Sequence, residues 1–426
     1  MTKTINNENK KLNFSNEREQ SQACLNSAEH EKNQGQKVLN VPNKREQNQT
    51  CLDSAEREGL RPKGNVPNLR FPEFHGEWEK CKLGDIAPLQ RGFDLPTGQI
   101  NNGKFPVVYS NGIMNYHSSY KCVAPGLITG RSGTIGKFTY IEGGYYWPHN
   151  TSLWVTDFYD NNPKFIYYLY QTIRIEQYST GSGVPTLNRN NVHRHQTFIP
   201  KLEEQNKIAI FLSLLDERIA TQNKIIEDVK KLKCAIIEKL YEEVKGTKYF
   251  YRQLFNIINE RNKQLEYSNV LSASQEKGMV SREDLNLDIQ FERSNINTYK
   301  IVRNGDYVIH LRSFQGGFAF SEKTGICSPA YTVLRPNNLL VYGYLSNYFT
   351  SRDFVKSLII VTYGIRDGRS INVDEWLKMK VVIPPKEQQT HIANVIESIE
   401  NKIKNEETYS NFLLNQKQYL LHQMFI

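Results

Sequence analysis

The residues best suited to chemistry are arginines, asparagines and hydroxyl side chains gathered in glycine-rich stretches between short apolar segments. Arginine donates two hydrogen bonds to guanine, asparagine and glutamine do so to adenine, and cations and hydroxyls hold phosphates. The candidates for nucleic-acid contact in the first half of the chain are Arg131, Ser132, Thr134, Tyr146, His149, Asn150 and Arg189. Those in the second half are Arg312, Ser313, Gln315, Lys323, Tyr363, Arg366 and Arg369. The alternative is an ordinary surface, since arginines and asparagines are common in loops and glycines serve tight turns.

The sequence contains no complete motif for catalysis or for a bound cofactor. The stretch Gly130 to Phe138 (GRSGTIGKF) resembles a phosphate-binding loop, but five residues instead of four separate its outer glycines. Phe138 also stands where that loop needs a serine or threonine. His193 and His195 have no cysteine or carboxylate cluster to complete a metal site, which favours a solvated loop. We therefore predict that the chain itself is not an enzyme and holds no cofactor or metal.

Length and composition set limits on the class of protein. The chain has 426 residues, enough for two or three domains, and its 54 Lys and Arg against 45 Asp and Glu give a net charge of +9. No apolar run approaches the ~20 residues that a membrane span requires. The first residues lack the apolar core of a signal peptide, and the six cysteines follow no disulfide or metal pattern. We expect a cytoplasmic protein with no membrane contact and some affinity for polyanions.

The first 64 residues differ from the rest of the chain. They are rich in Asn and Gln and poor in apolar side chains, so they cannot bury enough surface to offset the entropy of ordering. A tandem duplication lies within them, because residues 16–29 recur as residues 43–56 with 10 of 14 positions identical. We expect residues 1–64 to form a disordered tail.

A larger repeat organises the remaining chain. Ile199 to Ile219 aligns with Ile383 to Ile403 at an offset of 184, with seven of 21 residues identical. Earlier in each copy, Pro148 to Leu153 (PHNTSL) aligns with Pro329 to Leu334 (PAYTVL) at an offset of 181. The chain therefore contains two copies of one unit, and the copies differ only by small insertions.

Each copy is expected to end in a long helix. Apolar residues recur at spacings of three, four or seven over residues 201–246 and again over residues 386–426. Each helix follows an Ile-Pro pair, which suits a helix start. Two helices of ~40 residues would each span roughly 60 Å, and we expect them to pair with each other in antiparallel orientation.

The segments before these helices have the patterns of mixed α/β domains. The strands predicted in the first copy are Phe105–Tyr109, Lys137–Ile141, Thr151–Val155 and Gln196–Ile199, with a helix over Asn161–Gln177 that Asn162 caps. The second copy predicts strands at Tyr299–His310, Tyr331–Leu334 and Lys380–Ile383, and a helix near Leu340–Lys356. The expected order is thus a tail, a mixed domain over residues 65–200, a central helix, a mixed domain over residues 247–385, and a final helix.

This organisation resembles the specificity subunit of type I restriction-modification enzymes. The segment Asn65 to Ile86 (NVPNLRFPEFHGEWEKCKLGDI) is similar to the start of that family's first target-recognition domain. Gly181 to Val192 (GSGVPTLNRNNV) and Gly368 to Gln389 (GRSINVDEWLKMKVVIPPKEQQ) are similar to its domain-end and helix-start motifs. The resemblance covers residues 65–426 and implies an α+β fold. In that fold, two pseudo-symmetric mixed α/β target-recognition domains are joined and followed by two long antiparallel coiled-coil helices.

The resemblance also implies a function. Each target-recognition domain would read one half of a bipartite site on double-stranded DNA, while the helices set the gap between the halves. The helices would dock two DNA adenine methyltransferase subunits, and two restriction subunits that translocate DNA would complete the assembly. S-adenosylmethionine, ATP and magnesium are then expected on those partner subunits. Two alternatives remain, a non-catalytic coiled-coil scaffold and a stand-alone DNA-binding protein.

Overall fold

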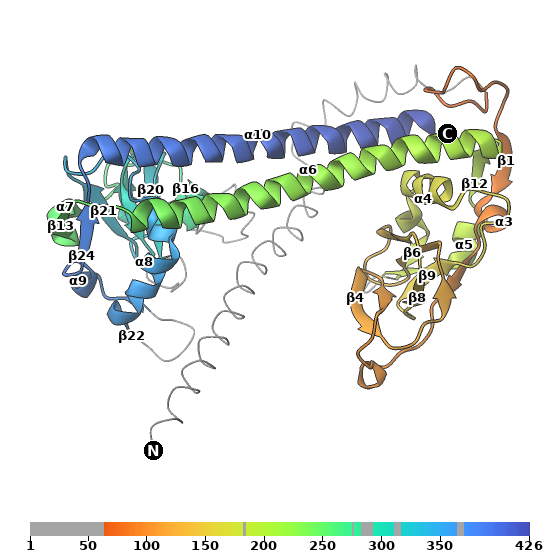
Figure 1. Cartoon of the computed structure of the whole chain (residues 1–426), viewed down its shortest axis with the longest axis horizontal. Coiled ribbons are helices and arrows are strands. Elements are labelled where there is room, and N and C mark those ends of the chain that lie inside the picture. Colours follow the sequence, from red (N-terminus) through yellow and green to blue (C-terminus); the bar gives the residue numbers. More distant parts are fainter. Residues whose placement is uncertain (1–63, 182–184, 275–276, 283–292, 311–316, 364–369) are drawn as a thin grey trace. The chain divides into compact units, whose positions relative to one another are not determined.

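The computed structural model describes residues 64–181, 185–274, 277–282, 293–310, 317–363 and 370–426 (Figure 1). The predicted tail, apart from Gly64, lies outside these ranges. The chain divides into two compact units, one of residues up to Gln222 together with Tyr409–Ile426, and one of Asn223–Thr408. Each unit therefore combines a mixed domain with part of helix α6 (Leu202–Glu242) and part of helix α10 (Lys386–Met424).

The first unit is built on two four-stranded sheets. The inner sheet has the order β2-β9-β6-β7 and the outer sheet the order β4-β3-β8-β5, while β1-β12 and β10-β11 form smaller pairs. The strands are β1 (Glu79–Lys82), β2 (Leu89–Arg91), β3 (Phe105–Tyr109), β4 (Gly112–His117), β5 (Cys122–Val123), β6 (Gly126–Gly130), β7 (Phe138–Ile141), β8 (Tyr145–Pro148), β9 (Ser152–Val155), β10 (Ser179–Thr180), β11 (Thr186–Leu187) and β12 (Gln196–Ile199). The helices before α6 are α3 (Leu83–Ile86), η1 (Thr97–Gln99), α4 (Pro163–Thr172), η2 (Ile175–Tyr178) and α5 (Arg189–His193).

The second unit repeats the inner sheet with the same strand order, β14-β21-β18-β19. It also repeats the two small pairs, as β13-β24 and β22-β23, but in place of the outer sheet it has the pairs β15-β16 and β17-β20. The strands are β13 (Thr247–Phe250), β14 (Phe255–Ile258), β15 (Leu271–Ser274), β16 (Gly278–Ser281), β17 (Lys300–Val302), β18 (Tyr307–Ile309), β19 (Phe318–Phe320), β20 (Gly325–Cys327), β21 (Thr332–Pro336), β22 (Thr362–Tyr363), β23 (Ser370–Ile371) and β24 (Lys380–Ile383). The helices are α7 (Tyr251–Leu254), η4 (Arg293–Thr298), η5 (Tyr348–Thr350), α8 (Arg352–Ser357), η6 (Leu358–Val361) and α9 (Val373–Trp376). The duplication inferred from sequence is thus a duplication of topology.

Most of the predicted local structure is confirmed. The side chain of Asn162 caps α4 by accepting from the backbone N–H groups of Lys164 and Phe165, each at 2.9 Å. Two of the predicted short helices need correction. The helix expected to reach Gln177 ends at Thr172 and gives way to η2, and the helix expected near Leu340–Lys356 is instead turns followed by η5 and α8. Gly343 lies in that stretch at φ +69°, outside the α-helical region, so a continuous helix cannot pass through it.

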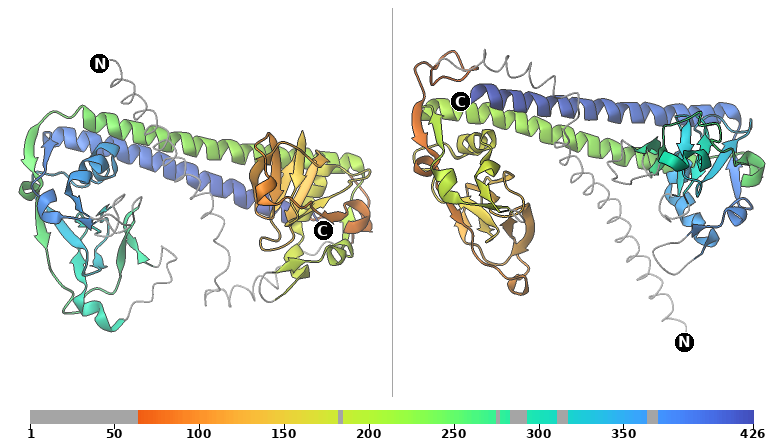
Figure 2. Two further views of the ribbon diagram at one scale, coloured as in Figure 1. Left: turned by 90° about the horizontal axis from the view of Figure 1, so that it is seen from below. Right: turned by 180° about the vertical axis from the view of Figure 1, so that it is seen from behind.

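The two long helices run antiparallel within each unit (Figures 1 and 2). In the first unit Asp216 of α6 pairs with Lys417 of α10 at 2.7 Å, and Leu212 lies in the same buried cluster as Leu420. In the second unit Lys230 pairs with Glu407 at 2.8 Å and Lys233 with Glu400 at 2.6 Å. Partner numbers fall along α10 as they rise along α6, as antiparallel pairing requires.

A buried glutamine joins each mixed domain to the start of its long helix. Gln205 accepts from the backbone N–H of Asn162 at 2.9 Å, and its amide donates to the carbonyl of Pro200 at 3.0 Å and to the side chain of Asn161 at 2.9 Å. Gln389, 184 residues later, accepts from Val341 N–H at 2.8 Å and donates to the carbonyls of Pro384 and Leu339 at 2.9 and 3.0 Å. These two side chains are only 2% and 1% exposed. We call each arrangement a glutamine junction.

The glutamine junctions predict a sharp contrast between neighbouring substitutions. Gln389→Leu leaves the buried carbonyl of Pro384 and the partly buried Leu339 carbonyl and Val341 N–H without these partners. The loss is about 1–3 kcal/mol for the buried group and smaller for the two groups that water can reach. We expect the substitution to lower the free energy of unfolding by about 2–4 kcal/mol. The same change at Gln388, which is exposed, serves as the matched control and should have little effect. Urea denaturation followed by circular dichroism compares the two variants, and equal stabilities would contradict the role assigned to Gln389.

Candidate nucleic-acid interface

A cleft of ≈ 730 Å³ in the first unit brings together residues from three separate parts of the chain. One side is formed by the end of β2 and the loop after it, another by Arg131 and Leu153, and the third by β10, β11 and the start of α5. The lining residues are Gln90, Arg91, Gly92, Phe93, Asp94, Arg131, Leu153, Thr180, Thr186, Leu187, Asn188 and Arg189.

Backbone pairing at the end of the inner sheet fixes Arg131 in this cleft. Its N–H donates to the carbonyl of Thr151 at 2.9 Å, and its carbonyl accepts from Leu187 N–H at 2.7 Å. The preceding Gly130 has no room for a side chain, because an added Cβ would lie 1.7 Å from the carbonyl oxygen of Thr134. Gly130 therefore allows the backbone of Thr134 to approach closely.

Three arginines give the cleft a positive character, since Asp94 is the one carboxylate among the described residues that line it. The Arg131 guanidinium is half-buried and donates to the carbonyl of Asn150 at 3.2 Å. Arg91 forms an exposed ion pair with Asp94 at 3.1 Å. Arg189 is exposed at the first residue of α5, where the Asn188 side chain caps the helix by accepting from Asn190 N–H. Such a site offers guanidinium donors to an anion or to base edges.

Most of the other predicted contact residues of the first unit make contacts within the fold. Tyr146 is a correction, because its side chain is 1% exposed within a buried cluster and cannot reach a ligand at the surface. The half-buried ring of His149 contacts Thr151 Oγ1 at 3.0 Å and the Leu95 carbonyl at 3.3 Å, and burial lowers its pKa. Asn150 donates to Asp94 beside the cleft. Ser132 pairs with Thr186 across a backbone bridge, and Thr134 is exposed.

The two histidines of the HRH segment also support the domain. Nε2 of His193 accepts from the backbone N–H of Leu89 at 2.8 Å, which fixes α5 against the start of β2. Burial and the nearby Arg189 both lower the pKa of His193, consistent with a neutral, accepting nitrogen. His195 contacts the hydroxyl of Tyr178 at 2.7 Å. These packed side chains correct the expectation of a solvated loop.

Sequence reasoning missed Arg91, although a signal was present. Arg91 precedes Gly92, whose position leaves no space for a Cβ because the carbonyl oxygen of His149 would be 2.2 Å away. Arg91 enters the cleft because β2 pairs with β9, where Arg91 lies opposite Leu153. The pair Arg91-Gly92, an arginine beside a glycine at a close backbone approach, is the sequence pattern that could have identified Arg91 as a candidate.

Only two of the seven candidates of the second unit, Lys323 and Tyr363, belong to the described residues. Arg312, Ser313, Gln315, Arg366 and Arg369 lie outside the described residues. Lys323 is exposed, and its carbonyl accepts from the Ser321 hydroxyl at 2.7 Å. Tyr363 belongs to β22, whose backbone pairs with β23.

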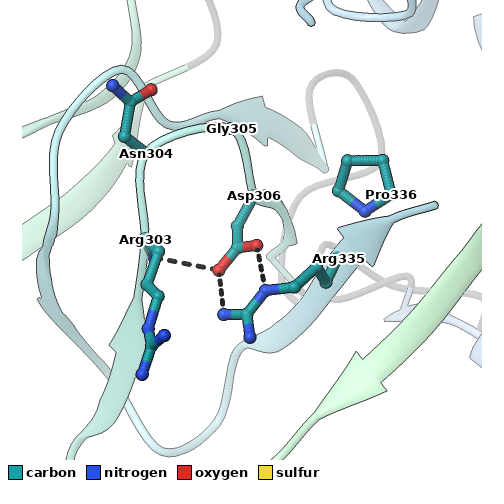
Figure 3. A pocket seen from close by; sticks show the side chains of 6 residues that line it. All are labelled: Arg303, Asn304, Gly305, Asp306, Arg335 and Pro336. Atoms are coloured by element: carbon teal, nitrogen blue, oxygen red, sulfur yellow. Dashed lines mark hydrogen bonds and ion pairs between the residues drawn. The ribbon is translucent and has the colours of Figure 1, made fainter. Parts of the chain in front are cut away.

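A smaller pocket of ≈ 300 Å³ in the second unit surrounds a buried ion pair (Figure 3). The carboxylate of Asp306 accepts from the Arg335 guanidinium in two hydrogen bonds of 2.9 Å and from the backbone N–H of Arg303 at 2.9 Å. The Asp306 side chain is 2% exposed, and the hydrogen bond to it raises the pKa of Arg335. These contacts stabilise the turn that separates β17 from β18, where sequence analysis expected one continuous strand. The acceptor atoms of Asp306 are thus engaged within the fold.

The described part of the chain contains no group of three or more His, Cys, Asp and Glu arranged to hold a metal. It also contains no helix that is long and apolar enough to cross a membrane.

Comparisons with known proteins agree with this geometry. Residues 75–231 match the family model described as the type I restriction modification DNA specificity domain. The putative type I restriction enzyme MjaX specificity subunit of Methanocaldococcus jannaschii is 24% identical over 242 residues, which cover 51% of this chain and 55% of that protein. The match thus spans about half the length of this curated relative.

Solved structures show the same fold over most of the chain. The S subunit of a type I restriction-modification system from M. genitalium has a TM-score of 0.52 at 15% identity, covering 85% of this chain and 99% of that one. A chain from a structural study of complex assembly in a type I R-M system has a TM-score of 0.51 at 14% identity, covering 81% and 96%.

The family model identifies a type I restriction modification DNA specificity domain at residues 75–231, and the fold of the chain is similar to that of a solved type I specificity subunit. About half of the chain is similar in sequence to a specificity subunit of a type I restriction enzyme. The resemblance seen in the sequence is therefore confirmed.

Proposed function

We propose that this chain is the DNA sequence-specificity subunit of a type I restriction-modification complex and that each mixed domain reads one half of a bipartite site. The observation that carries the proposal is the duplication of the inner sheet, with strand orders β2-β9-β6-β7 and β14-β21-β18-β19. Each copy meets its long helix through a glutamine junction. Two copies of one recognition domain, each attached to a long helix, suit a DNA site whose two halves are separated.

The arginine-lined cleft is the proposed reading site of the first domain. Exposed guanidinium groups match the acceptor pairs of guanine, and Asn188 at the same cleft offers an amide. Arg189 is the strongest candidate for contact with bases or phosphates because it is exposed, whereas Arg131 supports the Asn150 carbonyl. The chain contributes recognition, and catalysis belongs to partners.

The helix pair is the proposed spacer and docking element. Ile210 and Leu214 of α6 and Phe412 and Tyr419 of α10 belong to the first unit and are between 59% and 63% exposed. Their helical spacing places them away from the buried stripe of each helix, where an apolar partner would cover them. We assign this surface to a DNA adenine methyltransferase subunit, with two such subunits and two restriction subunits in the full complex. S-adenosylmethionine, ATP and magnesium would be bound by those subunits.

Reconstitution with a methyltransferase partner tests this function. The purified chain should not methylate DNA by itself, and adenine methylation should appear when the methyltransferase subunit is added. Transfer of a radiolabelled methyl group from S-adenosylmethionine measures both conditions. Robust adenine methylation by the isolated chain would contradict a pure specificity role, as would a methyltransferase whose target sequence is the same with and without the chain.

The cleft predicts unequal effects for two arginines of the first unit. If Arg189 makes a bidentate base contact, Arg189→Ala should weaken binding of the assembled complex by about 1–3 kcal/mol and relax preference at one half-site. Arg194→Ala removes an exposed arginine that does not line the cleft and should leave the preference intact. Binding to duplexes with single base changes measures this. A salt dependence of log K that is flatter by about 0.9, at unchanged sequence preference, would make Arg189 a phosphate contact. Loss of sequence preference at both half-sites would contradict independent reading.

A further inference from the structure

The outer sheet of the first unit lies in a stretch of sequence with an unusual charge pattern. Residues 95–141 contain Lys104, Lys121, Arg131 and Lys137 but no aspartate or glutamate. The corresponding stretch of the second unit, residues 263–322, contains eight acidic residues. The second unit also has the pairs β15-β16 and β17-β20 in place of this four-stranded sheet. Residues 95–141 thus carry a net charge of +4, whereas residues 263–322, with seven basic residues, carry −1.

Exposed aromatic rings and lysines lie together on this outer sheet. The Tyr120 ring lies 4.3 Å from that of Tyr145 and 5.1 Å from that of Phe105, measured between ring centroids. Tyr120 and Tyr145 are 45% and 44% exposed. Lys104 Nζ lies 5.5 Å from the Phe105 ring, and Lys121 Nζ lies 5.0 Å from the Trp147 ring. Across the described residues, neither of these exposed ammonium groups forms an ion pair, so their charge is available to an anion.

This surface continues from the outer sheet to the cleft. The Tyr109 ring of β3 lies 4.2 Å from the ring of His149, and the next residue, Asn150, accepts from Arg131 at the cleft. Lys137 donates to the carbonyl of Asn111, in the turn between β3 and β4, at 3.0 Å. A ligand held at the cleft that extends along this turn would therefore meet a surface without carboxylates from residues 95–141.

We infer that the outer-sheet face around Lys104, Tyr120, Lys121 and Tyr145 binds the sugar–phosphate backbone of double-stranded DNA that extends from the cleft. The inference rests on the proposed function, since it presupposes that the cleft holds DNA. Lysine ammonium groups act as point charges that suit phosphates, and the tyrosine rings present flat surfaces to the sugars. The face adds affinity without reading sequence.

The test compares two double variants of the assembled complex of this chain with its methyltransferase subunits. Lys104→Gln with Lys121→Gln removes the proposed contacts, and Lys80→Gln with Lys82→Gln removes two exposed lysines of β1 as the matched control. Binding is measured over a range of salt concentrations to a duplex that carries the methylated sequence mapped in cells and to a duplex that lacks it.

The outer-sheet variant should bind both duplexes more weakly, with the ratio of affinities unchanged. Each lost phosphate contact should flatten the slope of log K against log salt by about 0.9, so two contacts flatten it by about 1.8. Unchanged affinity, or an equal loss in the control variant, overturns the inference. A changed ratio shows that the face reads bases and overturns the backbone assignment. A wild-type complex that does not distinguish the duplexes refutes the proposed function instead, while the non-specific duplex still tests the face.

Discussion

The attachment of each mixed domain to its long helix depends on one constraint: a buried side-chain amide must form hydrogen bonds. Gln205 and Gln389 satisfy this constraint in the same way. Each donates to the carbonyl of a proline just before its long helix and accepts from a backbone N–H in a loop of the adjoining mixed domain. Because an unpaired buried group is costly, each domain has one favoured attachment to its helix. A second fixed contact exists in the first unit, where Arg70 makes a bidentate pair with the buried Glu204 at 2.7 Å. Within each unit, the mixed domain is therefore held in a defined position on the start of its long helix.

The two units share this attachment to a long helix and differ in the surfaces of their mixed domains. Both retain the inner sheet, the pair that precedes the long helix, and the asparagine-capped short helices α5 and α9. They diverge where the first unit has an outer sheet with aromatic rings and lysines and the second has a turn held by Asp306 and Arg335. A constant frame with dissimilar surfaces suits a protein whose two domains recognise different sequences. The divergence also explains why sequence identity between the copies is concentrated at the helix starts.

Much of the fold could be predicted from the sequence, because its patterns are local. The strands Phe105–Tyr109 and Lys380–Ile383 match their predicted bounds, and Asn162 caps α4 as expected. The binding surface was harder to predict, because it depends on pairing between distant residues. Tyr146 stands in an aromatic, loop-like segment, but β8 turns its side chain into the core, and Arg91 reaches the cleft only because β2 pairs with β9. Residue type alone could not distinguish these two outcomes.

The most direct measurement of the central claim is the gap between half-sites when the helix pair is lengthened. Four helix-forming residues inserted after Lys231 in α6 and after Lys402 in α10 preserve the register of the Lys233–Glu400 pair and add ~6 Å and about 40° of rotation. One base pair adds roughly 3.4 Å and about 35°. Mapping of methylated adenines in cells should show both half-sites unchanged and the gap widened by one or two base pairs. An assembled, active variant that keeps the original gap would contradict the account.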